Sequence, residues 1–259
     1  MTGRFSLYAE YFRSDPADFA IYLIMFVSAL LISLILHEVA HGYVALQCGD
    51  PTARNFGRLS LRPSHHLDPL GTLCMVLVGI GWARPVPVNP RNFRNGTRDD
   101  FLVSIAGICV NLTLFILSCF LSVVIGRFLW NVPFDPTNSF LNPYERGFYL
   151  EYWYIKDLIP YMNSPLLGYA LRFFLMLGQM NLALAIFNFL PFPPLDGFHV
   201  VNDLLLKGRL VLTRQMHTYA HIALLVLVYS GILNSILTVA NRFMYTNVLN
   251  VFLRILGGA

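Results

Sequence analysis

Two histidines and one glutamate carry the most specific chemistry in this chain. His37 and His41 are four positions apart, and Glu38 directly follows the first of them. Residues at this spacing share one face of a helix, so both imidazoles can bind one metal ion and supply half of a tetrahedral zinc site. A carboxylate beside such a site can take a proton from water and pass it to a leaving amine. The pattern indicates zinc-dependent hydrolysis, although three matching positions also arise by chance.

A third ligand must come from elsewhere in the chain, and the best candidate is Asp196. It follows a proline-rich stretch that starts after Asn188 and ends at Gly197. The prolines end a helix and force extended backbone, and Gly197 permits a tight turn. Asp196 therefore lies on a rigid corner, which suits a carboxylate ligand. Taken alone, Asp196 is better explained as a helix-capping residue in a loop.

The surroundings of the histidine pair are apolar. Hydrophobic residues make up 56% of the 259 positions and charged residues only 12%, against about 25% charged in a soluble domain. The pair interrupts a long apolar run, and ionisable groups inside a membrane are costly and usually functional. This context favours a functional interpretation of His37, Glu38 and His41 over chance.

Long apolar runs predict an all-α polytopic membrane protein, because about 20 apolar residues cross a bilayer as a helix. We expect a bundle of about four to six transmembrane helices, with a re-entrant or short β element near the active site. Four runs are long enough, and they cover 19–47, 101–129, 166–190 and 219–239. The stretch 67–83 is short and rich in glycine, which favours a re-entrant hairpin, and 248–256 is either interfacial or a partial span. We expect a single domain over 1–259, with a catalytic core at about 19–203 and C-terminal helices at 211–259.

Basic residues predict the orientation, because short loops rich in arginine and lysine stay in the cytoplasm. Arginines flank 67–83 on both sides, and further basic residues follow 166–190, whereas 131–165 has no basic excess. The active site is thus expected on the cytoplasmic side of an integral membrane protein, in a prokaryotic inner membrane. The histidine pair and Asp196 reach the same side, although neither was used to assign the topology.

Other site types are disfavoured by composition. The net charge of +4 is modest, and its basic residues lie in short loops, so no nucleic-acid-binding face is expected. The four cysteines include no Cys-x-x-Cys spacing, which argues against a disulfide framework and a cysteine-ligated zinc. A second histidine pair, His217 and His221, has no adjacent carboxylate and is interpreted as interfacial or structural.

The motifs together resemble the site-2 protease family of intramembrane zinc metalloproteases. The resemblance is carried by His-Glu-Val-Ala-His-Gly at 37–42 and by Asn-Phe-Leu-Pro-Phe-Pro-Pro-Leu-Asp-Gly at 188–197, and it covers about 19–203. It implies one Zn²⁺ per chain, with His37, His41 and Asp196 as ligands and Glu38 as catalytic base. Asn111 and Asn188 match family asparagines, for which oxyanion binding and helix–helix hydrogen bonding are equally plausible. The chain lacks PDZ and CBS domains, as in the compact bacterial branch.

The expected activity is regulated intramembrane proteolysis, that is, hydrolysis of peptide bonds in or near the transmembrane segment of a single-span membrane protein. The expected partners are this substrate and the lipid bilayer; no oligomeric state is indicated. The extended segments 57–61 and 85–88 are candidates for pairing with an unwound substrate by strand addition. The alternative is a membrane metal-binding protein or transporter without proteolytic activity, and a third is an inactive scaffold that binds membrane helices.

Overall fold

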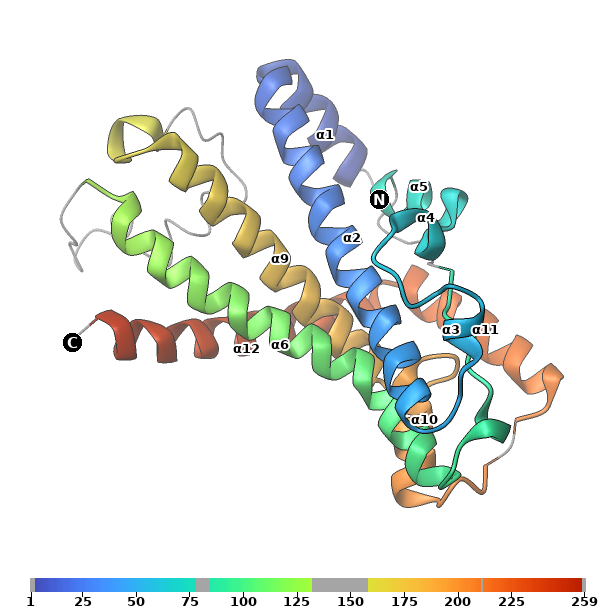
Figure 1. Ribbon diagram of the computed structural model, residues 1–259. Coiled ribbons are helices and arrows are strands. Elements are labelled where there is room, and N and C mark those ends of the chain that lie inside the picture. The colour runs from blue at the N-terminus through green and yellow to red at the C-terminus, as the bar shows by residue number, and fades with distance from the viewer. Residues whose placement is uncertain (1–2, 78–83, 132–157, 211, 258–259) are drawn as a thin grey trace.

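The protein is all-helical throughout the part that the computed structural model describes, residues 3–77, 84–131, 158–210 and 212–257 (Figure 1). The α-helices are α1 (Gly3–Ser14), α2 (Pro16–Gln47), α3 (Thr52–Asn55), α4 (Pro63–His66), α5 (Pro69–Leu77), α6 (Thr97–Leu129), α9 (Pro165–Phe189), α10 (Asp196–Leu205), α11 (Arg214–Tyr229) and α12 (Ile232–Gly257). Two short 3₁₀ helices, η1 (Pro90–Asn92) and η3 (Ile159–Tyr161), join them.

Three helices, α2, α6 and α9, are long and apolar enough to cross a membrane, so the chain is an integral membrane protein with three candidate spans. They match the predicted runs 19–47, 101–129 and 166–190 closely. The N-terminal end of α2 is fixed locally, because the Asp15 side chain accepts the N–H of Asp18 and Pro16 occupies the first helical turn.

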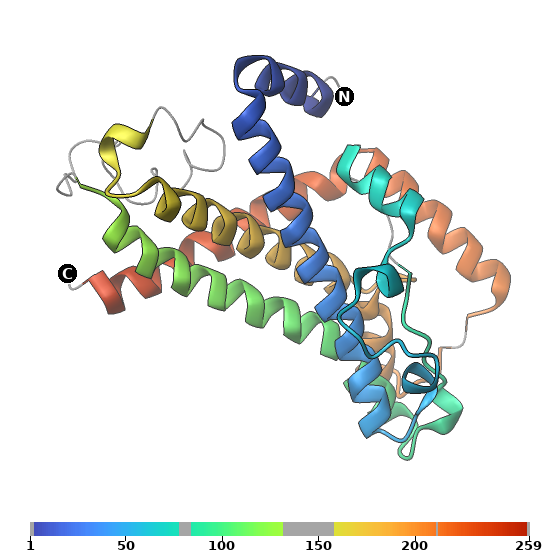
Figure 2. The same cartoon turned by 45° about the horizontal axis from the view of Figure 1, so that its top comes forward.

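The three long helices pack against one another and form the centre of the molecule. In Figures 1 and 2, α6 and α9 run side by side, and α2 lies across them with α10 near its C-terminal end. Helix α12 crosses beneath α6 and α9. One buried apolar cluster joins Phe115 and Cys119 of α6 to Leu182 of α9 and Leu249 of α12.

The C-terminal part differs from the prediction of one span over 219–239. The helix breaks between Tyr229 and Ile232, where Gly231 has a positive φ of 78°. The tail 248–256, expected as a separate short element, is instead the end of the 26-residue helix α12. Arginines and asparagines within α12 interrupt its apolar sequence, which is why hydropathy alone divided it wrongly.

An ion pair at the other end of the bundle joins α9 to α2. Arg172 is fully buried, and its Nη1 lies 3.1 Å from Oδ1 of the nearly buried Asp18. Tyr11 of α1 donates its hydroxyl to Asp18 and accepts a hydrogen bond from Arg172. This cluster ties α1, α2 and α9 together, and Figure 2 shows α1 turned back at the start of α2.

The expected β element is not formed by the described residues. Both 57–61 and 84–89 lack strand pairing; Leu67 takes part in a single β-bridge, and another bridge, Trp130 with Met162, lies at the other end of α6. Pro85, Pro87 and Pro90 have no N–H, so 84–90 is a poor partner for a ladder. Of the predicted re-entrant stretch, Pro69–Leu77 is helical and 78–83 lies outside the described residues, as do 132–157 of the predicted external loop.

Candidate metal centre

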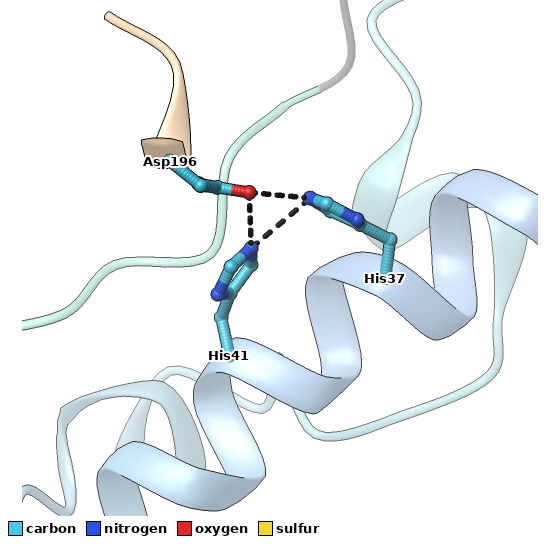
Figure 3. Close-up of side chains that lie close together, drawn as sticks. All are labelled: His37, His41 and Asp196. Carbon is cyan, nitrogen blue, oxygen red and sulfur yellow. Dashed lines mark hydrogen bonds and ion pairs between the residues drawn. The ribbon is translucent and has the colours of Figure 1, made fainter. Parts of the chain in front are cut away.

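Helix α2 places both predicted histidine ligands on one face. The Nε2 atoms of His37 and His41 lie 3.0 Å apart, and the two rings are nearly perpendicular. Both side chains are almost fully buried, one turn apart. Figure 3 shows the two rings pointing from this helix toward the same point.

The turn between α9 and α10 places a third side chain beside the two histidines. Asp196 is the first residue of α10, and its Oδ2 lies 3.2 Å from Nε2 of His37 and 3.4 Å from Nε2 of His41. A side chain at Gly197 would collide with the backbone at Phe189 and Leu190, so this position needs a glycine for the chain to fold back so closely. The predicted corner is therefore present, and it aims a carboxylate at the histidine pair.

The three donor atoms fit a tetrahedral zinc ion. Around zinc with arms of about 2.0–2.1 Å, neighbouring ligand atoms are about 3.3 Å apart. The three separations of 3.0, 3.2 and 3.4 Å match this spacing. Asp196 Oδ2 is buried and accepts no hydrogen bond of normal geometry within the described part of the chain, although two imidazole nitrogens are close. A cation between the three atoms would satisfy all of them.

The protonation states also suit a metal. Nδ1 of His41 lies 2.7 Å from the carbonyl oxygen of Val103, so this nitrogen donates its proton and Nε2 keeps a lone pair for the metal. Burial raises the pKa of the Asp196 carboxyl, but the neighbouring imidazoles of His37 and His41 outweigh it and hold the pKa well below its usual value. Asp196 is therefore an anionic ligand at neutral pH.

Glu38 has a fixed position beside the cluster. Its Oε2 accepts the backbone N–H of Val86 at 2.8 Å, and no hydrogen bond to its Oε1 occurs among the described residues. The carboxylate is thus held by one oxygen, while the other keeps its lone pairs. This is a suitable arrangement for a group that takes up and releases a proton.

The backbone of α6 closes the site from another side. A Cβ atom at Gly107 would lie 2.5 Å from Cε1 of His37 and 2.6 Å from Nε2 of His41. These distances are far below van der Waals contact, so only glycine lets α6 approach the two rings this closely.

The two predicted asparagines are placed differently. Asn111 is fully buried one turn beyond Gly107, and neither of its amide atoms has a hydrogen-bond partner in the described part of the protein. Asn188 is half-buried near the end of α9. Their catalytic roles stay predictions.

Other candidate residues do not form a second site. Among the described residues, His37, His41 and Asp196 are the one group of three metal-ligating side chains close enough to share an ion. Nδ1 of His221 is hydrogen-bonded to the carbonyl of His217 within α11. The contacts from Val103 and Val86 were not foreseen, because a backbone carbonyl or N–H leaves no mark in a residue pattern.

Comparison with known proteins agrees with the geometry. Residues 25–230 match the model of peptidase family M50. The chain is 37% identical over 201 residues to the Bacillus subtilis (strain 168) protein named "Putative zinc metalloprotease YwhC", and the alignment covers 78% of each chain. No solved structure matches the chain significantly.

Proposed function

Because the chain belongs to peptidase family M50, the site-2 protease family of zinc metalloproteases, we propose that it hydrolyses peptide bonds in or near transmembrane segments of membrane proteins. The observation that supports this most directly is the meeting of Asp196 with His37 and His41, which lie beside Glu38 on a helix long and apolar enough to span a membrane. A protease site in such a helix suits a substrate that is itself embedded in the bilayer.

The residues take distinct roles in this proposal. His37, His41 and Asp196 hold one Zn²⁺, which when bound polarises the scissile carbonyl and makes water a better nucleophile. Glu38 accepts the proton of the attacking water on its carboxylate and gives it to the leaving nitrogen. Asn111 and Asn188 are candidates for hydrogen bonding to the developing oxyanion.

The membrane setting is part of the proposal. Arginine-rich segments on both sides of α5 favour a prokaryotic inner membrane with the metal centre toward the cytoplasm. The substrate would be a single-span protein whose helix unwinds before cleavage. The predicted count of four to six spans would require segments besides α2, α6 and α9, such as α11 or α12, to lie in the same bilayer.

Replacing Glu38 with glutamine tests the proposed activity. The wild type and Glu38→Gln are reconstituted in liposomes with a candidate single-span substrate, and cleavage and bound zinc are both measured. We expect zinc-dependent cleavage by the wild type, and a loss of at least about 100-fold in Glu38→Gln at unchanged zinc content, since general-base catalysis contributes this much.

A chelator-treated sample of the wild type is the control, and its activity should return on adding Zn²⁺. Equal cleavage by the wild type and Glu38→Gln would contradict the role of the base. Bound zinc without cleavage of a panel of single-span substrates would instead support a membrane metal-binding protein or transporter.

A further inference from the structure

The segment 84–94, which we call the strap, crosses the end of α2 that carries the metal centre. We propose that Asp50 and Val86 are positioning residues, which act through the strap to hold the Glu38 carboxylate in place for catalysis. This inference rests on the proposed function, because it assigns a role in the reaction of Glu38.

The first attachment of the strap is to the loop before α5. Arg84 donates its backbone N–H to the carbonyl of His66 at 2.8 Å. Arg58 donates from Nη2 to the carbonyls of Arg84 and Pro85, at 2.7 and 3.1 Å. His66 is itself fully buried, and its Nε2 lies 2.6 Å from the Ser60 carbonyl. The chain on the N-terminal side of Val86 is therefore held on both of its edges.

Val86 is the second attachment, and it contacts α2 twice. Its backbone N–H donates to Oε2 of Glu38, and its side chain is nearly buried. A Cβ at Gly42 would lie 2.9 Å from Cγ1 of Val86 and 2.8 Å from Cδ2 of Leu59. The glycine after His41 thus leaves a notch that the Val86 side chain fills, and this packing sets the direction of the Val86 N–H.

Prolines flank Val86 on both sides within the strap. Pro85, Pro87 and Pro90 have no N–H, so Val86 has the sole donor between its two proline neighbours. That donor faces the predicted catalytic base. In this arrangement the Val86 N–H is not available to pair with a substrate strand.

Asp50 makes the third attachment, just beyond the C-terminal end of α2. It is fully buried, and its Oδ2 accepts the N–H of Asn89 at 2.7 Å. Its Oδ1 accepts Nδ2 of Asn92 at 2.7 Å, together with the N–H and hydroxyl of Thr52. One buried carboxylate therefore joins the strap to the end of the helix that carries Glu38.

The three attachments together restrict the glutamate. A glutamate side chain has several freely rotating bonds, and an unheld carboxylate would sample positions unsuited to proton transfer. The Val86 N–H removes this freedom before substrate arrives, which is how a supporting shell raises catalytic efficiency. Asp50 acts at a distance, because its loss would let Asn89 and then Val86 move.

The test compares Asp50→Asn with the wild type, both zinc-loaded. Asparagine keeps the size of the side chain but replaces one acceptor oxygen with a donor, so at least one of the bonds to Asn89 and Asn92 must break. We expect kcat for a single-span substrate to fall about 10- to 100-fold, with KM and zinc content within about twofold of wild type.

Hydrogen exchange resolved to single amides supplies a readout independent of cleavage. We expect the amides of both Asn89 and Val86 to exchange at least about tenfold faster in Asp50→Asn. Asp203→Asn is the control: Asp203 is also a buried aspartate, but it lies in α10 beside Asp100 and His199, away from the strap. Asp203→Asn should leave the exchange of the Val86 amide unchanged.

Two further variants keep the proposal open to refutation. If Asp50→Asn does not fold, Asn92→Ala, which removes one of the bonds, should give a smaller change of the same kind. The exchanged pair Asp50→Asn with Asn92→Asp can rebuild the link between positions 50 and 92, and it should recover most of kcat. The proposal would be overturned if, in Asp50→Asn, the Asn89 amide exchanges faster but the exchange rate of the Val86 amide is unchanged. This outcome would leave the protease activity itself unaffected as a conclusion.

Discussion

At the scale of single residues, the metal centre depends on how closely α6 approaches α2. The two histidine rings lie against the backbone of Gly107, and His41 also donates to the carbonyl of Val103 one turn earlier. The ring positions are thus determined by main-chain atoms of a second helix. A small displacement of α6 would move both rings.

Adding one methyl group at Gly107 tests this dependence. The new Cβ in Gly107→Ala would overlap both rings, so we expect at least about a tenfold loss in zinc affinity, as for other changes that displace ligand supports. Competition with a chromophoric chelator measures the affinity. Gly126→Ala is a control in the same helix, because a Cβ there meets nothing within 4 Å. Similar zinc affinities for the two variants would refute the steric argument.

The ligands could be predicted from the sequence, and their supports could not. Residue type and motif identified the ligands His37, His41 and Asp196, and the structure brings their side chains together. Val86 and Val103 act through backbone atoms that every residue possesses. Asp50 belongs to no sequence motif, because its role depends on hydrogen bonds with Asn89 and Asn92 that form only after folding.

At the scale of helices, apolar length predicted α2, α6 and α9 well, because burial in lipid requires a continuous run whatever the neighbours are. It failed where polar residues and one glycine divide the C-terminal part into α11 and α12. The re-entrant or β element near the metal centre stays a prediction, because the described residues form no strand there and 78–83 lies outside them. The effect of a single glycine or of a few polar residues on the sequence pattern is smaller than that of a long apolar run, so such helix breaks are harder to predict.

Helix α10, which starts with Asp196, docks on the start of α6 through acidic residues. Burial and the neighbouring Asp100 carboxylate raise the pKa of Asp203 to about 6, and the positive charge of His199 opposes them. His199 itself lies 3.3 Å from Asp100, whose hydrogen bond raises the pKa of the imidazole. The contact between α10 and α6 therefore includes groups whose charge changes with pH, beside the apolar cluster of Ile108, Ala185 and Val200.

This raised pKa predicts a pH-dependent stability. Between about pH 4 and pH 6 the folded chain holds a proton on Asp203 that the unfolded chain releases, so the free energy of unfolding falls as the pH rises. Asp203→Asn removes this contribution. Its thermal midpoint in detergent should therefore exceed that of the wild type by an amount that grows from about pH 4 to pH 6 and then stays constant. A difference independent of pH would contradict the assignment.

At the scale of the whole molecule, the buried ion pair of Asp18 and Arg172 holds the end of the bundle opposite the metal centre. Removing one partner of a buried pair leaves an uncompensated charge, whereas replacing both can be nearly neutral. Arg172→Met should therefore destabilise the protein by about 3–5 kcal/mol. The double variant Asp18→Asn with Arg172→Met should lose clearly less.

Reversible unfolding in mixed micelles measures both variants. Equal losses in the single and double variants would show that Arg172 matters through its contacts with the rings of Tyr11 and Tyr22 rather than through its pairing with Asp18. The prediction of one domain over 1–259 stays a prediction, although α12, beyond the matched range 25–230, packs on the same core as α6 and α9.

The separation of the metal ligands along the chain has a consequence for biosynthesis. A ribosome that has translated the first two candidate spans has already made His37, Glu38 and His41, whereas Asp196 follows the third. The buried ion pair is also completed late in synthesis, since Arg172 lies 154 residues after Asp18. A nascent or truncated chain would thus carry two metal-binding histidines without their carboxylate partner. We expect such fragments to be harmless to the membrane proteins around them, because proteolytic competence arrives only with the last part of the core.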